Sequence, residues 1–182
     1  MEQKVERFIS EDFAEYLYIR TQLGEGFMDG TQVPDAKASY SDPVMNNLLI
    51  ALKPKVEQLY GKKLHETYSF YRVYTEGKEL PPHTDRPACE VSVSICLGYS
   101  AEYIWPLFVD GKPFSMTPGE GVIYKGCDQL HWREPFRRIA NPDYTPIHSQ
   151  VFLHYIEAGG QFDPEHKYDG RTFEEMVGGG PK

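Results

Sequence analysis

The sequence predicts a mostly β (α+β) fold, in which a barrel or jelly roll is supported by N-terminal helices. Two helical stretches come first, and roughly seven or eight short β-type runs follow, separated by turn residues. Aromatic residues make up 14% of the chain, and such residues favour strands. The length of 182 residues suits one domain, which we divide into a helical support (1–66), a β core (67–157) and a C-terminal tail (158–182).

The first predicted helix begins after Ser10. A hydroxyl at this position can act as the N-cap, and the acidic residues that follow suit a first helical turn. The pattern predicts a helix from about Glu11 to Gln22, which ends before Gly24. The following segment, 24–40, is rich in turn residues, so we expect a loop there.

The second predicted helix begins at Pro43, because proline is favoured in the first helical turn. It should end near Gly61, where a glycine can cap the C-terminus. Between them, apolar residues recur at helical spacing and predict a stripe that packs on a sheet: Leu48, Leu49, Leu52, Val56 and Leu59.

The remaining runs are typical of strands that are buried on at least one face. Turns at Gly77, Gly111 and Gly119 separate several of them. The predicted strands are Thr67–Thr75, Glu90–Leu97, Ile104–Val109, Val122–Lys125 and Ser149–Ile156. A further extended segment, Pro81–Asp85, follows the turn at Gly77. The glycine-rich end of the tail, Gly178–Lys182, is expected to fray.

His83, Asp85 and His131 are the candidate metal ligands. Residues i and i+2 of a strand point to the same face, so His83 and Asp85 can bind one ion together. His131 must then come from a neighbouring strand. Two imidazoles and one carboxylate form the ligand set of non-haem Fe(II) oxygenases, in which the other metal positions stay open for substrate and oxygen.

Composition argues against several other classes. The formal charge of −8 repels phosphate backbones and anionic lipids, so we expect neither a nucleic-acid nor a membrane partner. No apolar run approaches the length of a membrane span. The three cysteines, Cys89, Cys96 and Cys127, form no disulfide-like pattern and are interpreted as reduced thiols in a cytoplasmic protein.

A longer pattern carries a family resemblance. Five motifs stand in order: Arg72-Val73-Tyr74 before a glycine turn, His83-Thr84-Asp85, Pro118–Tyr124, His131, and the aromatic strand Val151–Tyr155. Together they resemble the 2-oxoglutarate/Fe(II)-dependent dioxygenases, and most of all the prolyl 4-hydroxylase-like branch. The resemblance covers 68–157 strongly and the N-terminal helices less specifically.

The resemblance implies a double-stranded β-helix (jelly-roll/cupin-like) core and a specific chemistry. His83, Asp85 and His131 would bind Fe(II), and 2-oxoglutarate and O2 would take the remaining metal positions. The enzyme would hydroxylate a substrate while releasing succinate and CO2. The substrate could be a prolyl residue, a peptide or protein, or a small molecule, and the chain could act as a monomer or homodimer.

The sequence departs from this branch at the anchor for the distal carboxylate of 2-oxoglutarate. A basic residue usually opens the last strand, where this chain has His148. Arg133 is the predicted replacement, because it lies two residues after His131 and shares its face if the strand continues. Arg137, Arg138 and His148 remain alternatives. Tyr74 resembles the family tyrosine that hydrogen-bonds the same carboxylate.

Other interpretations of the motifs remain open. His83 and Asp85 could belong to an ordinary turn, since Pro81 and Pro82 precede them. A structural zinc site is disfavoured because no C-x-x-C pair is present. A cupin-like metal barrel, acting as an isomerase or a binding domain without 2-oxoglutarate, is the main alternative, and an interaction domain with a decayed site is a third.

Overall fold

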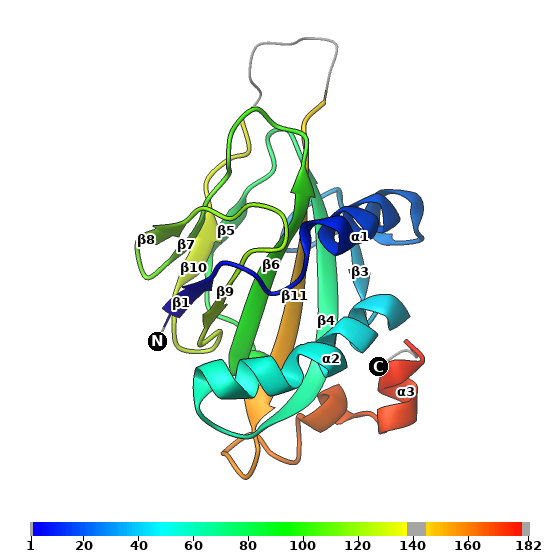
Figure 1. Cartoon of the computed structure of the whole chain (residues 1–182), viewed down its shortest axis with the longest axis vertical. Coiled ribbons are helices and arrows are strands. Elements are labelled where there is room, and N and C mark those ends of the chain that lie inside the picture. The colour runs from blue at the N-terminus through cyan, green and yellow to red at the C-terminus, as the bar shows by residue number, and fades with distance from the viewer. Residues whose placement is uncertain (1, 138–144, 180–182) are drawn as a thin grey trace.

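Two antiparallel β-sheets and the helices that cover one of them make up the computed structural model, which describes residues 2–137 and 145–179 (Figure 1). The large sheet has the strand order β1-β9-β6-β11-β4-β3-β2, and the small sheet has the order β5-β10-β7-β8. Strands that are distant in sequence alternate within each sheet, as in a jelly roll. The mostly β fold that the sequence predicts is therefore confirmed.

The strands of the large sheet are β1 (Glu2–Val5), β2 (Phe27–Asp29), β3 (Ala36–Tyr40), β4 (Leu64–Thr75), β6 (Val91–Tyr99), β9 (Gly121–Tyr124) and β11 (Ile147–Glu157). Those of the small sheet are β5 (Leu80–His83), β7 (Leu107–Val109), β8 (Lys112–Phe114) and β10 (His131–Arg133). The long pairing of β11 with β4 and β6 forms the centre of the large sheet.

The helices begin where the sequence provides caps. Helix α1 (Glu11–Leu23) is capped by the Ser10 hydroxyl, which accepts from the Phe13 amide at 3.3 Å. Helix α2 (Pro43–Tyr60) is capped by Asp42 and ends at Gly61, whose φ of 83° lies in the left-handed region that glycine adopts easily. The shorter elements are the 3-10 helices η1 (Pro87–Cys89) and η2 (Lys167–Gly170) and the helix α3 (Phe173–Val177).

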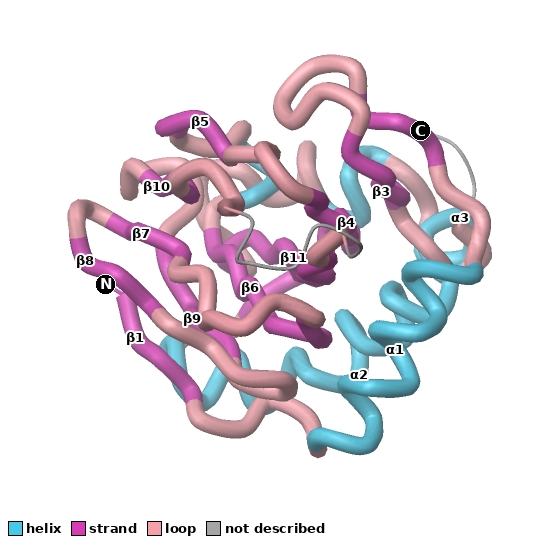
Figure 2. Tube along the Cα trace, turned by 90° about the horizontal axis from the view of Figure 1, so that it is seen from above, coloured by secondary structure: helices cyan, strands magenta, loops and turns pink. Residues whose placement is uncertain are grey.

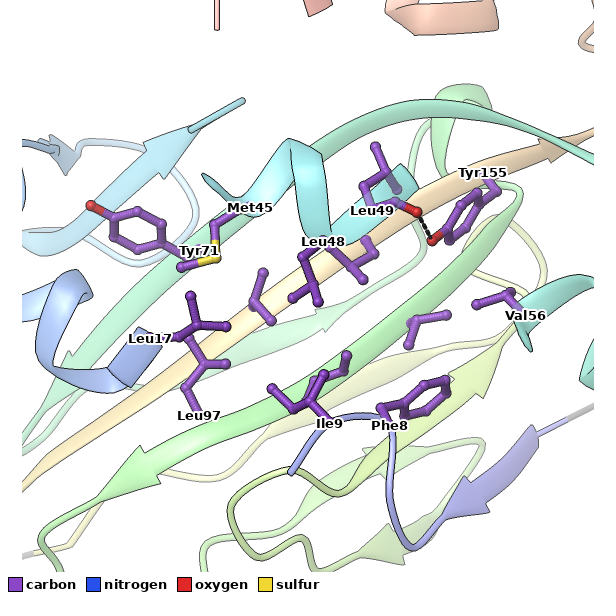
Figure 3. Close-up of a cluster of buried hydrophobic side chains, with 14 of the residues drawn as sticks. Phe8, Ile9, Leu17, Met45, Leu48, Leu49, Val56, Tyr71, Leu97 and Tyr155 are labelled. Carbon is purple, nitrogen blue, oxygen red and sulfur yellow. Dashed lines mark hydrogen bonds between the residues drawn. The ribbon is translucent and has the colours of Figure 1, made fainter. Parts of the chain in front are cut away.

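The main hydrophobic core lies between the helices and the outer face of the large sheet (Figure 3). Leu17 of α1 and Leu48 and Leu49 of α2 pack there against strand residues such as Tyr71. The Tyr155 hydroxyl donates to the Leu49 carbonyl at 2.7 Å, which fastens α2 to β11. The helices thus serve as the structural support that the sequence predicts.

The opposite face of the large sheet looks toward the small sheet (Figure 2). Alternation along β4 explains the division: Tyr71 and Val73 join the helix-side core, whereas Phe70 and Arg72 line a cavity between the sheets. The small sheet contributes Leu107 and Val109 to a second core at one end of this inner space.

The structure corrects several expectations. Part of segment 24–40, expected as a loop, forms β2 and β3 and extends the large sheet beyond β4. Strand β1 lies within the supposed helical support and pairs with β9. The predicted strand Ile104–Val109 shortens to β7, and β8 follows it. The tail contains η2 and α3.

Two general features bear on the environment of the protein. The helices in the described ranges include none that is long and apolar enough to cross a membrane. Cys89, Cys96 and Cys127 are free thiols, as expected.

Candidate active site

Pairing of β5 with β10 brings the two candidate histidines together. His131 stands directly opposite His83 in the antiparallel register, and their ring centroids are 4.2 Å apart. Asp85 lies just beyond the end of β5, where its backbone N–H donates to the Gly126 carbonyl at 2.8 Å. Asp85 and His131 are 46 positions apart in the chain, but all three residues meet at one end of the small sheet.

Their donor atoms face a common point. The Asp85 Oδ1 atom lies 3.5 Å from Nε2 of His83 and 3.5 Å from Nε2 of His131. All three ligand atoms lie within 4.8 Å of one another. The structure thus brings the three predicted residues together in a group that could hold one small cation.

Backbone carbonyls fix the orientation of both imidazoles. His83 Nδ1 is 2.8 Å from the Pro81 carbonyl, and His131 Nδ1 is 3.0 Å from the Gln129 carbonyl. In each case the carbonyl belongs to the residue two positions earlier. A proton on Nδ1 satisfies each carbonyl and leaves the Nε2 lone pair for a metal, an arrangement common among metal-binding histidines.

A hydroxyl orients the other oxygen of Asp85. Ser92 Oγ lies 3.2 Å from Asp85 Oδ2 and 2.9 Å from Nδ1 of His154, so a His154–Ser92–Asp85 chain of hydrogen bonds can form. Burial opposes ionisation of Asp85, but hydrogen bonds that the His131 and His83 imidazoles can donate through Nε2 when no metal is bound outweigh it and lower the pKa of this carboxyl well below its usual value. Asp85 is therefore a carboxylate, the form that binds metal.

A second cluster shares Asp85. Ligand atoms of Asp85, Cys89 and His154 also lie within 4.8 Å of one another. Burial raises the pKa of the Cys89 thiol well above its ordinary value, and the thiol lies 3.0 Å from the Tyr68 hydroxyl. Cys89 is thus a protonated, hydrogen-bonded thiol, and we interpret it as part of the wall of the site.

Arg133, the predicted anchor, is buried deeply beside the triad. One Nη atom donates to the Trp105 carbonyl at 2.6 Å, and the guanidinium lies over the Trp105 ring. Its Nε and second Nη atoms are buried and have no hydrogen-bond partner among the residues that the structure describes. Burial accordingly lowers the pKa of Arg133. A cation in this position lacks an anion.

Glu120 and Glu134, the acidic residues that could be expected to pair with Arg133, are engaged elsewhere. Glu120 pairs with Lys4 at 2.9 Å, and the Glu134 carboxylate accepts from the Trp132 indole at 3.1 Å. Trp132 stacks on Phe108 with ring centroids 5.2 Å apart, and it does not line the cavity between the sheets.

The other candidate anchors are placed differently. His148, at the start of β11, is buried, and burial together with the nearby Arg133 lowers its pKa to about 3, so it is neutral at physiological pH. Its Nδ1 is a further buried atom without a partner in the described part of the chain. Arg137 is exposed, and Arg138 lies outside the described residues.

Tyr74 faces the same inner space. It is fully buried, its ring packs edge-on against Trp105 at 5.0 Å, and its hydroxyl accepts from Arg72 at 3.2 Å. Tyr74, His148 and Arg133 therefore cluster around Trp105, and none of the three lines the cavity between the sheets.

A cavity of about 460 Å³ opens beside the triad. Its lining includes Phe70, Phe152 and Tyr68 from the large sheet. Arg72 also lines it and was missed as a functional candidate, although its position two residues before Tyr74 places both on one face of a strand. Arg72 pairs with Asp29 at 2.5 Å, so this second buried arginine already has its anion.

Comparisons with known proteins agree with this architecture. No protein-family model and no curated protein matches the sequence. Among solved structures, the viral collagen prolyl hydroxylase vCPH from Paramecium Bursaria Chlorella virus-1, in complex with 2-oxoglutarate, matches with a TM-score of 0.64 and 11% identity over 86% of this chain and 96% of that chain.

Two further structures match to a similar extent. A prolyl-4-hydroxylase from Pseudomonas putida has a TM-score of 0.62 and 15% identity, over 86% of this chain and 93% of its own. The α-ketoglutarate-dependent epimerase SnoN from nogalamycin biosynthesis has a TM-score of 0.63 and 13% identity, over 86% and 78%. This likeness confirms that the chain has the jelly-roll fold of the 2-oxoglutarate/Fe(II) oxygenases, including prolyl hydroxylases.

Proposed function

We propose that this chain is an Fe(II)- and 2-oxoglutarate-dependent dioxygenase that hydroxylates a substrate and releases succinate and CO2. The observation that carries the proposal is the convergence of His83 Nε2, His131 Nε2 and Asp85 Oδ1. The ligand set suits Fe(II), and three protein ligands leave positions for 2-oxoglutarate and O2. When bound, the metal would supply activation of O2.

Arg133 is proposed to bind the distal carboxylate of 2-oxoglutarate. Its two unpartnered nitrogens match the paired oxygens of a carboxylate, which arginine binds with two parallel hydrogen bonds. The Tyr74 hydroxyl can add a further hydrogen bond. His148 is neutral, so it can shape the pocket but cannot supply the charge. The unpaired Arg133 favours an anionic co-substrate over the cupin-like alternative.

The cavity beside the triad is proposed to admit the prime substrate. Aromatic rings from Tyr68, Phe70 and Phe152 form one wall, and segment 27–32 forms part of another. Two of the matching structures are prolyl hydroxylases, and we propose a prolyl residue, a peptide or a small molecule as the prime substrate. The free thiols suit a reducing compartment, and we propose a cytoplasmic location.

An anaerobic titration with Fe(II) and 2-oxoglutarate tests the proposal. Formation of the visible charge-transfer band of an Fe(II)–keto-acid chelate is expected with the wild type. Asp85→Ala and His131→Ala should each abolish it while the protein remains folded by circular dichroism. Succinate formation in air then confirms turnover.

Two outcomes would contradict the proposal in different ways. Metal binding without the band and without succinate would favour the cupin-like barrel. A full band in both triad variants would show that the metal ligands lie elsewhere.

A further inference from the structure

Asp169, in the C-terminal segment, contacts the residue that follows the metal-binding carboxylate. Its carboxylate accepts two hydrogen bonds from Arg86, at 2.6 Å and 2.8 Å. The two residues are separated by 83 positions in the chain. The Asp169 side chain is completely buried, whereas that of Arg86 is 41% exposed and lines the cavity beside the triad.

The surroundings hold this pair in one geometry. The Arg86 guanidinium lies 4.5 Å from the centre of the Tyr68 ring, and the Tyr40 hydroxyl donates to the Asp169 carboxylate. Tyr168 and Asp169 have φ values of 52° and 57°, in the left-handed region that non-glycine residues rarely occupy. The backbone therefore adopts an uncommon conformation where it presents Asp169 to Arg86.

The C-terminal segment itself is fastened to the body of the protein. Helix α3 has a complete capping box between Thr172 and Glu175. Met176 is buried in the main core, and its carbonyl accepts from the Asn46 side chain. The support under Asp169 is thus independent of the metal ligands.

If it were released from Asp169, Arg86 would compete with the metal ion for the Asp85 carboxylate. Its guanidinium is on the residue adjacent to Asp85, and arginine binds carboxylates strongly. Engagement of Asp85 by Arg86 would draw the carboxylate from the metal, and an uncompensated cation in the cavity would repel a divalent ion. In the structure, the bidentate contact with Asp169 occupies and neutralises this cation.

We propose that Asp169 is a positioning residue for the metal centre: by holding Arg86, it keeps the neighbouring Asp85 carboxylate available to the metal ion. This inference rests on the proposed metal site. It makes the C-terminal segment a required part of that site, although none of the segment's described residues belongs to the triad.

Mn(II) affinity, measured by calorimetry without 2-oxoglutarate, tests this role separately from activity. Asp169→Asn should weaken Mn(II) binding at least tenfold. The double variant Asp169→Asn/Arg86→Met should recover an affinity within threefold of the wild type, because the competing cation is gone. A merely structural role would leave the double variant as weak as the single one, and that result would overturn the proposal, as would wild-type affinity in Asp169→Asn.

Further variants separate folding from positioning. Thr172→Ala loosens the cap of α3 and should lower the melting temperature of the metal-free protein without changing Mn(II) affinity. If Asp169→Asn does not fold, Arg86→Met alone decides: wild-type affinity is expected, and a large loss would show that Arg86 itself supports Asp85. Equal binding by wild type and His83→Ala, or none by the wild type, would refute the metal centre and the inference with it.

Discussion

The Arg133 guanidinium lies against the Trp105 indole, 4.6 Å from the ring centre, and donates to the carbonyl of the same residue. Trp105 thus holds the cation by its ring and its backbone without neutralising the charge. Two buried nitrogens of Arg133 remain without a partner in the described residues. The cost of this unpaired cation suggests that the site is built to be completed by an anion.

Arg133→Met should affect stability and co-substrate binding in opposite directions. Without 2-oxoglutarate, loss of unsatisfied buried groups should raise the free energy of unfolding by about 1–2 kcal/mol, measured by denaturant titration. The KM for 2-oxoglutarate should rise about 10- to 150-fold, because charge-assisted hydrogen bonds worth about 1.5–3 kcal/mol are lost. An unchanged KM would assign the anchor to another residue.

Arg72→Met is the matched variant, because Arg72 is also buried but already pairs with Asp29. Removal of its guanidinium leaves the Asp29 carboxylate buried without its counter-ion and should lower the free energy of unfolding by about 3 kcal/mol. The KM for 2-oxoglutarate should change less than about threefold, since the anchor is intact. A larger rise in KM than in Arg133→Met would indicate that Arg72, and not Arg133, anchors the co-substrate.

His148 should make the protein less stable in acid. Burial, and then the Arg133 cation, lower its pKa from 6.5 to about 3 in the folded protein. The unfolded chain therefore binds a proton between these values that the folded protein excludes, so stability is full above pH 6.5 and falls as the pH drops toward 3. At pH 5 the loss relative to pH 7.5 should be about 2 kcal/mol.

Urea unfolding of the wild type and His148→Gln at several pH values checks this prediction. Glutamine keeps a polar group but cannot titrate, so the wild type should lose more stability than the variant between pH 7.5 and pH 5. Parallel pH profiles would mean that His148 is protonated in the folded protein or that its environment is not preserved.

The parts of the fold that were predictable from sequence are those with a local signal. Ser10 and Gly61 mark helix ends through their own side chain or backbone preferences, and the structure uses both. The i and i+2 spacing of His83 and Asp85 is also a local signal, although only His83 lies in a strand and Asp85 follows the end of β5. Such signals survive in the folded protein because tertiary contacts reinforce them.

The missed elements depend on partners that are distant in the chain. Strand β1 has the sequence Glu2-Gln3-Lys4-Val5, which carries no strand pattern, and it forms by pairing with β9. Asp169 has a left-handed conformation and contacts Arg86, and no local sequence preference predicts this contact. The unpartnered nitrogens of Arg133 likewise depend on neighbours such as Trp105, which is distant in the sequence.

Gly126 lies close behind the carboxylate of Asp85, the proposed metal ligand, and leaves little room for a side chain. A Cβ atom there would lie 2.3 Å from the Cys89 carbonyl oxygen, 2.6 Å from Asp85 Oδ2 and 2.6 Å from Ser92 Oγ. Gly126→Ala should therefore displace Asp85, weaken Fe(II) binding at least about tenfold, and lower the free energy of unfolding by about 1–3 kcal/mol.

Gly30→Ala provides the control for this substitution, because a Cβ atom at Gly30 would meet nothing within 4 Å. Its Fe(II) affinity and stability should stay close to those of the wild type. Isothermal titration of both variants under anaerobic conditions, together with denaturant unfolding, gives the two quantities. If Gly126→Ala lost stability but kept wild-type Fe(II) affinity, the Asp85 carboxylate would have to tolerate displacement. That outcome would argue against a tightly fixed ligand at this position.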